Sequence, residues 1–325
     1  MSPKATLENR LSRLNEAARQ TRGEQLAEEL HRAFESRSNI LAARAAEITA
    51  RRGLANLTPL LVRRFDDFMT DPEKTDKGCT AKTAIARALN ELNYAEAGLF
   101  LRGLRHVQME PVYGGQVDTA DQLRGECVQG LVRIGYEEAA LEVAGLALDP
   151  CPAARRAAIR ACVGLPGQSG ELIARMKVLG GDEDAEVMSE CFTALIRLSP
   201  ARSVPFVARY LHASDPAVAE SAALSIGESR EPAAFGILRE AYENVYGVPA
   251  HRRLMLPIAL TRTPEAFEFL LQTIREQPLD LAAAALNALA VCACDEDRRQ
   301  QARLAVEQRD DPRLAQLFAQ RVAAP

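Results

Sequence analysis

The sequence contains no tryptophan, and its aromatic residues together make up only 5% of the 325 residues. A pocket that stacks nucleobases or planar ligands usually needs several aromatic rings, so this composition argues against such a pocket. The chain also lacks a large excess of either charge, because its formal net charge is only −4. No global field therefore draws it to nucleic acid or to an anionic membrane, although a local basic stripe is compatible with this total.

Long apolar runs and a paired set of cysteines are missing as well. No stretch approaches the ~18 consecutive apolar residues that a membrane span requires. The first twenty residues are charged from the start and contain no apolar signal-peptide core. The seven cysteines are odd in number and scattered, so we expect reduced thiols and a cytoplasmic protein. Nucleotide-binding and hydrolase motifs such as GxGxxG, Walker A, GxSxG and HExxH are also absent.

What the sequence does contain is one helical pattern that returns seven times. An anchor residue is followed by mostly apolar residues four, five and eight positions later, which places all four on one face of a helix. The seven anchors are Ala81, Leu123, Ala154, Val187, Val218, Arg252 and Leu281. Successive anchors lie 29 to 42 residues apart. A period of this size is typical of stacked repeats, each of which buries its apolar stripe against its neighbours.

A second set of amphipathic segments lies between the anchored ones, so each repeat is predicted to be helix A, a turn and an anchored helix B. The predicted A helices are 54–69, 137–148, 170–179, 203–212, 232–242 and 264–274. Asp-Pro pairs at 149–150, 215–216 and 311–312 mark predicted helix starts, because aspartate caps a helix and proline fits its first turn. We therefore expect one elongated, all-α, right-handed α-solenoid. Its predicted parts are an N-terminal helical cap (1–53), a repeat array (54–294) and a C-terminal helical cap (295–325).

Three B-helix segments resemble HEAT repeats, in particular the short bacterial type called PBS-lyase HEAT-like. They are LRGECVQGLVRIG, ARRAAIRACVGL and AVAESAALSIGES. The resemblance covers about residues 54–294 and implies an α-solenoid, but no single function, because such repeats serve many unrelated roles. It also implies a ladder in which a turn aspartate pairs with a basic residue directly after the anchor. Lys82, Arg124, Arg155 and Arg253 fill that position, whereas Met188, Ala219 and Ala282 interrupt the ladder.

Two turns, 70–80 and 108–119, are far longer than the other turns within repeats. Long turns in a helical array usually carry function, and consecutive repeats should place these two side by side. Tyr113 precedes two glycines, so a ring could supply contact area where the backbone approaches a partner closely. The candidate partner-binding residues of these turns are His106, Glu110, Tyr113, Asp118, Asp76 and Lys77. The alternative is a pair of ordinary solvated turns in which Asp118 only caps the next helix.

The same turns contain residue types that bind metals or act as nucleophiles. His106, Glu110, Asp76 and Cys79 qualify as metal ligands by type, but no ligand spacing supports a site. Nothing in the sequence brings Cys79 and His106 together as a nucleophilic pair. We therefore predict no metal, no cofactor and no catalytic residue.

The exposed line of the B helices, six positions after each anchor, is the second candidate surface. In HEAT arrays this face is concave, and here its first part is polar to basic. Its candidate partner-binding residues are Arg87, Gln129 and Arg160, with Arg133, Arg156 and Arg197 close by. Such a stripe suits an acidic peptide or a phosphate group. The alternative is a solvated face whose arginines pair with glutamates of the same helices.

These features predict a non-enzymatic scaffold or adaptor that holds a protein partner or peptide segment on its concave face and long loops. The resemblance leaves two alternatives. HEAT-like repeats occur in phycobilin lyases, which implies an enzyme or a lyase subunit. They also build alkylpurine DNA glycosylases, whose aromatic-lined, strongly basic cleft has no counterpart in this composition. The sequence predicts neither the partner's identity nor the oligomeric state.

Overall fold

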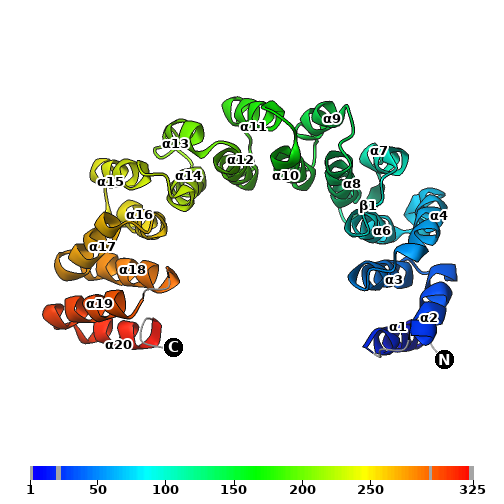
Figure 1. Cartoon of the computed structure of the whole chain (residues 1–325), viewed down its shortest axis with the longest axis horizontal. Helices are drawn as coiled ribbons and strands as arrows, with labels where there is room; N and C mark the ends of the chain where they lie inside the picture. Colours follow the sequence, from blue (N-terminus) through cyan, green and yellow to red (C-terminus); the bar gives the residue numbers. More distant parts are fainter. Residues whose placement is uncertain (1–2, 20–22, 293–294, 322–325) are drawn as a thin grey trace. The chain divides into compact units, whose positions relative to one another are not determined.

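The computed structural model describes residues 3–19, 23–292 and 295–321. In this part of the chain twenty α-helices are accompanied by three short 3-10 helices and one two-stranded β-hairpin (Figure 1). The protein is therefore an all-α solenoid of helical repeats, as predicted. The chain divides into two compact units, residues 1–173 and 174–325.

In the first unit the helices form successive pairs. The second helices of the pairs, α3, α6, α8 and α10, stack one against the next, and α2, α4, α7 and α9 pack beside them. The elements of this unit are α1 (Pro3–Arg19), α2 (Gly23–Glu35), α3 (Asn39–Arg51), η1 (Ala55–Leu57), α4 (Thr58–Met69), α5 (Pro72–Thr75), η2 (Lys77–Cys79), α6 (Thr80–Glu91), α7 (Ala97–Leu104), β1 (Met109–Val112), β2 (Gly115–Asp118), α8 (Asp121–Arg133), α9 (Ala139–Leu146), α10 (Pro152–Ala161) and η3 (Cys162–Gly164).

The second unit repeats the arrangement with α12, α14, α16 and α18 as its stacked helices. The division between the units falls within α11 (Ser169–Gly180). The remaining elements are α12 (Ala185–Leu198), α13 (Pro200–Ala208), α14 (Pro216–Ser229), α15 (Ala234–Asn244), α16 (Val248–Leu260), α17 (Pro264–Glu276), α18 (Leu279–Val291), α19 (Glu296–Arg309) and α20 (Pro312–Arg321). The predicted cap and array boundaries stay predictions, and residue 294 lies outside the described residues.

The seven anchored segments are the stacked helices α6, α8, α10, α12, α14, α16 and α18. In six of them the anchor and the residues four, five and eight positions later are all buried. The frame predicted for α16 is wrong, because Arg252 is exposed and the buried side chains are Leu254, Met255 and Ile258. The α16 anchor is therefore Ala250, which makes the spacing of the repeats more even.

This shift corrects one further expectation, because Arg253 does not occupy the ladder position of its repeat.

Helix starts follow the predicted capping chemistry, with one exception. Asp215 accepts a hydrogen bond from the Ala217 amide at the start of α14, and α20 begins at Pro312. At the predicted start 149–150, α10 instead begins two residues later, at Pro152. The Asp149 carboxylate accepts from the Cys151 amide (2.8 Å), but it also binds an arginine of the preceding repeat. That second interaction holds Asp149 outside the helix.

The two long turns are more ordered than plain loops. Residues 70–80 contain α5 and η2, and residues 108–119 form the β1–β2 hairpin, which the sequence analysis did not predict. No helix among the described residues combines the length and apolarity needed to cross a membrane.

Candidate partner-binding site

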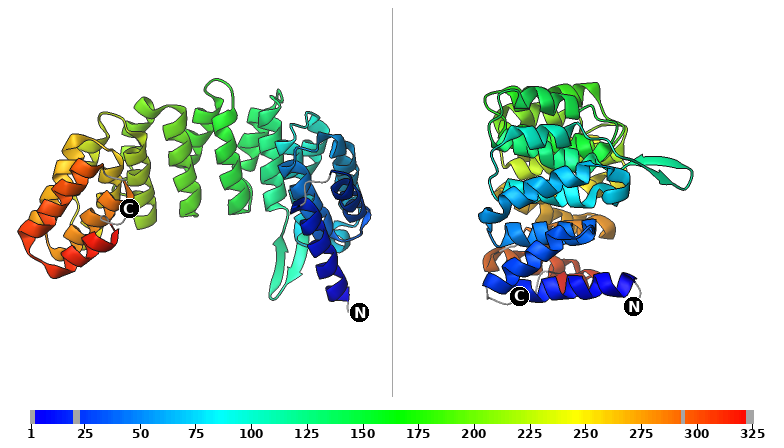
Figure 2. Two further views of the ribbon diagram at one scale, coloured as in Figure 1. Left: turned by 60° about the horizontal axis from the view of Figure 1, so that its bottom comes forward. Right: turned by 90° about the vertical axis from the view of Figure 1, so that its right-hand side faces the viewer.

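The β-hairpin projects from the helices of the first unit (Figure 2). Its strands pair Met109 with Asp118 and Val112 with Gly115, which leaves Tyr113 and Gly114 as a two-residue turn. Gly114 has φ +89°, in the left-handed region that a side chain would disfavour. Tyr113 at the tip is fully exposed, and Val112 and Val117 are each about half exposed. The hairpin therefore carries apolar side chains into solvent.

A buried ion pair supports the base of the hairpin. Lys82 on α6 and Asp76 in the preceding turn are both fully buried, with 3.1 Å between Lys82 Nζ and Asp76 Oδ2. Lys82 Nζ also donates to Gln108 Oε1 (2.9 Å), and Gln108 Nε2 donates to the Asp76 carbonyl (2.8 Å). Both charged groups are removed from water, so the Lys82 ammonium and the Asp76 carboxylate each need the other as a counter-charge.

Asp76 also holds the start of α6, because its carboxylate accepts from the Ala81 and Lys82 amides (2.8 and 3.0 Å). Asp76 was among the candidate partner-binding residues predicted for the long turns. The structure places it inside the protein, where it is a structural residue. Lys77, the next residue, is exposed.

Glu110 on β1 joins the two long turns. Its Oε1 accepts from the Gly78 amide (2.6 Å), Gln108 Nε2 (2.6 Å) and Thr119 Oγ1 (3.1 Å). Burial alone would raise the pKa of Glu110, but these hydrogen bonds outweigh it and lower the pKa. The prediction that the two turns lie side by side is thus confirmed, and Glu110 is a connecting group between them.

The other side of the hairpin base is held by Arg124 on α8. Its buried guanidinium binds Asp118 (2.7 Å), Asp149 (2.8 and 2.9 Å) and the His106 carbonyl (3.0 Å). Burial disfavours the charged guanidinium, but the two carboxylates raise the pKa of Arg124 above its usual value. The pKa of Asp118 is lowered despite burial, because the Ala120 and Gln108 amides and Arg124 donate to it. Burial lowers the pKa of His106, whose Nε2 lies 3.2 Å from Gln108 Oε1.

A groove of about 470 Å³ runs beside this base, between α3, α6 and α8. It is lined by charged side chains of both signs and by several small residues. Its lining residues are Ala43, Glu47, Gly78, Thr80, Thr83, Ala84, Arg87, Val117, Asp118, Thr119, Asp121 and Gln122. The groove thus includes three consecutive residues at the end of β2 and the turn after it.

In the predicted basic stripe on the B helices, two of the arginines already bind other groups of the protein. Arg87 is exposed but pairs with Glu126 of α8 (2.8 Å), and Arg133 donates to the Tyr94 carbonyl. The side chains of Gln129 on α8 and Arg160 on α10 are exposed. Arg156 on α10 is partly buried. Arg197 is exposed on α12, in the second unit.

The cysteine, histidine and carboxylate residues of the two long turns are not arranged as a nucleophilic or metal-binding site. Burial raises the pKa of Cys79 to about 12, so the group is a thiol at neutral pH and not a nucleophilic thiolate. Among the described residues no cluster of three or more His, Cys, Asp or Glu side chains is placed to hold a metal ion.

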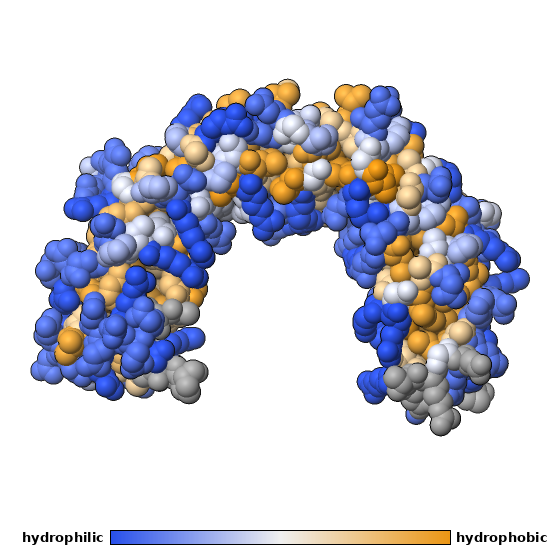
Figure 3. Space-filling model, viewed as in Figure 1, coloured by the Kyte–Doolittle hydropathy of each residue, from blue (hydrophilic) through white to orange (hydrophobic). Residues whose placement is uncertain are grey.

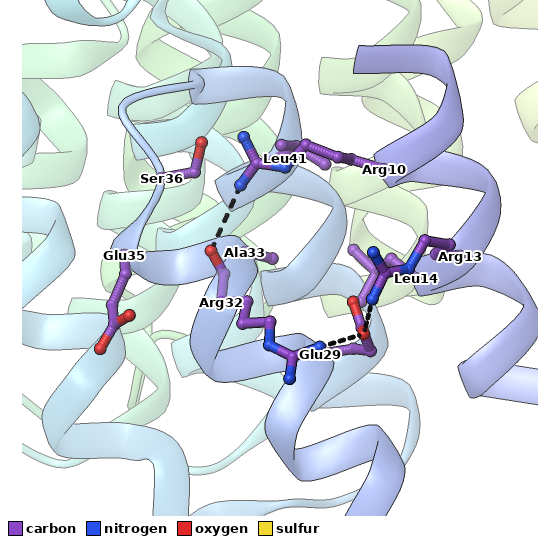
Figure 4. A pocket seen from close by; sticks show the side chains of 9 residues that line it. All are labelled: Arg10, Arg13, Leu14, Glu29, Arg32, Ala33, Glu35, Ser36 and Leu41. Atoms are coloured by element: carbon purple, nitrogen blue, oxygen red, sulfur yellow. Dashed lines mark hydrogen bonds and ion pairs between the residues drawn. The ribbon is translucent and has the colours of Figure 1, made fainter. Parts of the chain in front are cut away.

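Other surfaces carry weaker features. A pocket of about 300 Å³ between α1, α2 and α3 contains Arg10, Arg13 and Arg32 (Figure 4). Glu29 accepts from both Arg13 (2.6 Å) and Arg32 (2.8 Å), which offsets much of this positive charge. A different surface, at the top of the view in Figure 3, exposes apolar side chains over α9 and α11. On those two helices and just beyond α9 they include Leu141, Leu148, Leu172, Met176 and Leu179.

Several residues of this site escaped the sequence analysis. Lys82 was recognised only as a ladder residue, and Gln108, Val112, Val117 and Thr119 were not singled out. The available signal was Glu-Pro-Val-Tyr-Gly-Gly-Gln-Val, in which glycines follow and precede short apolar segments, as in hairpins.

No protein-family model and no curated protein matches this chain. Solved structures with a similar fold include the CpcE–CpcF complex of phycocyanin lyase from Nostoc sp. PCC7120, which is 13% identical over 78% of this chain and 94% of that one (TM-score 0.39). Human deoxyhypusine hydroxylase in complex with glycerol is 14% identical over 80% and 99% (TM-score 0.31). An engineered protein is 13% identical over 97% and 99% (TM-score 0.39). At these values the likeness concerns the helical-repeat fold alone.

Proposed function

We propose that this chain is a non-enzymatic, HEAT-type module that binds a protein partner through the hairpin and the adjacent groove. This hairpin–groove surface comprises Val112, Tyr113 and Val117 together with the groove residues between α3, α6 and α8. The observation that carries the proposal is a rigidly based hairpin that exposes three apolar side chains to solvent. Exposed apolar groups on a projecting element are typical of interaction sites, and tyrosine is frequent among the residues that dominate binding energy.

The base of the hairpin supports this function by reducing the cost of ordering a loop on binding. Two buried cations, Lys82 and Arg124, connect the hairpin to α6 and α8. A hairpin that is already ordered loses less conformational entropy when a partner binds, so more of the contact energy appears as affinity. The titratable groups nearby, Glu110, Asp118 and His106, are engaged in these supporting interactions. This favours a binding role over acid–base chemistry.

Affinity capture tests the proposal with two matched proteins. The first carries Val112→Ser, Tyr113→Ala and Val117→Ser, and the control carries Leu141→Ser, which alters an exposed leucine on α9. We expect a partner that the wild type and the control retain and that the triple variant loses. With the partner purified, the triple variant should bind at least about ten-fold more weakly, the effect of ~1.4 kcal/mol. Equal affinity of all three proteins, at unchanged melting temperature, would contradict the proposal.

A further inference from the structure

The two strands of the hairpin direct specific backbone groups away from each other. The Thr119 amide donates to the Gln108 carbonyl (2.9 Å), so Gln108 and Thr119 form a hydrogen-bonded pair. Antiparallel pairs alternate between bonded and non-bonded, so Met109–Asp118 and Pro111–Gln116 are non-bonded pairs. The amides and carbonyls of Gln116 and Asp118 therefore point outward from β2. Those of Met109, and the Pro111 carbonyl, point outward from β1.

The two outer edges differ in their ability to accept another strand. Pro111 has no amide hydrogen, so the β1 edge lacks a donor in the middle of the strand. The β2 strand, Gly115–Asp118, contains no proline and presents donors and acceptors at both outward residues. Only the β2 edge thus offers a complete set of backbone hydrogen-bonding groups.

The groove lies along the β2 side of the hairpin. Val117, Asp118 and Thr119 line it, whereas β1 contributes no lining residue among those described. A chain in the groove would therefore meet the hairpin at the end of β2 and not at β1, and it would reach the Gln116 backbone by continuing along the β2 edge beyond the groove. Val117 is about half exposed there and offers an apolar contact to such a chain.

The charges of the groove indicate the chemistry of the occupant. Glu47 pairs with Arg44 (2.7 Å), Asp118 with Arg124 (2.7 Å), and Arg87 with Glu126 (2.8 Å). Asp121, at the first turn of α8, forms no ion pair within the described residues, and its carboxylate accepts only from the Gln122 amide (2.8 Å). The unpaired charge in the groove is therefore negative, which suits a basic side chain on the occupant.

We propose that an extended segment of a partner protein binds in the groove as a third strand on the outer edge of β2. Its backbone bonds to Gln116 and Asp118, an aliphatic side chain packs beside Val117, and a lysine or arginine lies near Asp121. This is strand addition to an exposed sheet edge, in which backbone bonds give affinity and alternate side chains give specificity. The inference rests on the proposed function and names the kind of partner that the hairpin–groove surface takes.

Proline substitutions separate the two edges. Gln116→Pro removes one outward amide of β2 and leaves the bonded pairs of the hairpin intact, because residue 116 belongs to a non-bonded pair. Met109→Pro is the matched control, since it removes the outward amide of β1 in the same way. Gln116→Ala is the second control, because it removes the same side chain and keeps the amide. Circular dichroism and melting temperature establish that each variant is folded.

The probe is a phage-displayed peptide library selected on the full chain. We expect enriched peptides that alternate aliphatic residues with lysine or arginine. Synthetic versions should bind Gln116→Pro at least about ten-fold more weakly than wild type, and the two control variants within about two-fold. In the wild type, bound peptide should slow hydrogen exchange at the Gln116 and Asp118 amides and leave the Met109 amide unchanged.

Three results would overturn strand addition. Peptides that bind Gln116→Pro as tightly as wild type, or that slow hydrogen exchange at the Met109 amide, would refute it. If the triple variant of Val112, Tyr113 and Val117 still fails to bind these peptides, the proposed function stands without strand addition. Failure to enrich any peptide would also refute it, and the capture experiment would then judge the proposed function separately. A dimer seen by sedimentation and abolished by Gln116→Pro would identify the occupant as a second copy of this chain.

Discussion

The position directly after the anchor differs between the two units of the chain. In the first unit it holds the buried cations Lys82, Arg124 and Arg155. In the second unit the same position holds Met188, Ala219, His251 and Ala282, of which Met188 and Ala282 are buried and His251 is partly exposed. One helical repeat is thus built with a polar ladder in one unit and with apolar packing in the other.

The turns explain this difference. In the first unit, long turns return polar backbone and carboxylate groups to the protein interior, where Lys82 and Arg124 bind Asp76, Asp118 and several carbonyls. In the second unit the turns are short, and aspartates such as Asp184 and Asp215 cap the next helix locally. Lys82 and Arg124 thus accompany the two long turns that form the candidate site, whereas Arg155 donates to the Asp149 and Pro150 carbonyls of a short turn (2.9 and 3.0 Å).

The largest expected effect is that of removing the ladder cation of the first long turn. Lys82→Met should lower the free energy of unfolding by ~3–5 kcal/mol, because it leaves the Asp76 carboxylate buried without a counter-charge. Chemical denaturation followed by circular dichroism measures this change. Adding Asp76→Asn should restore part of the loss. The control is Met188→Leu in the second unit, which should cost less than ~1.5 kcal/mol. Equal costs for Lys82→Met and Met188→Leu would remove the distinction between the units.

Close helix packing should limit substitution in the second unit. A Cβ atom at Gly227 on α14 would lie 2.2 Å from the Pro257 carbonyl oxygen of α16, a backbone atom that cannot move independently. Gly227→Ala should therefore destabilise the protein by ~1–3 kcal/mol or more. Gly236 on α15 is the matched control, since nothing lies near its Cβ position, and alanine there should stabilise the helix by up to ~1 kcal/mol. Thermal unfolding of the two variants should shift in opposite directions.

Local capping should contribute less than either of these. Asp215 accepts from the Ala217 amide (2.8 Å), and its replacement by alanine should cost ~1 kcal/mol. Asp215→Asn keeps the accepting oxygen and should remain close to wild type in denaturant titrations. If asparagine is as costly as alanine, charge and not the hydrogen bond is what the turn requires.

The fold was predictable because each repeat buries one stripe of a helix, and that stripe recurs in the sequence. The frame failed at α16, where Leu254, Leu256, Pro257 and Ile258 are all apolar. A helix that is apolar around most of its circumference does not reveal which face is buried. Only contacts with α14 and α18 select Met255 and Ile258 as the buried row.

The site was predictable in position but not in structure. The lengths of the two turns indicated where the regular repeat is interrupted. The strands of the hairpin are only four residues long, and one contains Pro111, so neither has a strong strand pattern. The burial of Asp76 depends on Lys82 and Gln108, which lie six and 32 residues away along the chain. A carboxylate in a charged turn resembles a solvated group until these distant partners are known.

The smallest predicted effect is a loss of stability on acidification that originates in the first unit. Burial lowers the pKa of His106 below its usual 6.5, so the unfolded chain binds a proton there more readily than the folded one. Stability should therefore fall as the pH drops through 6.5 toward the folded pKa. Glu110 and Asp118 also have lowered pKa values, and their contribution, present above 4.5 and 3.8, should be lost at still lower pH. The melting temperature of the wild type should fall relative to that of His106→Gln on acidification between about pH 7.5 and 5.5, because the variant lacks the first loss. Parallel profiles would show that the His106 environment does not distinguish the folded from the unfolded protein, and the acid sensitivity of the hairpin base would then rest on the two carboxylates alone.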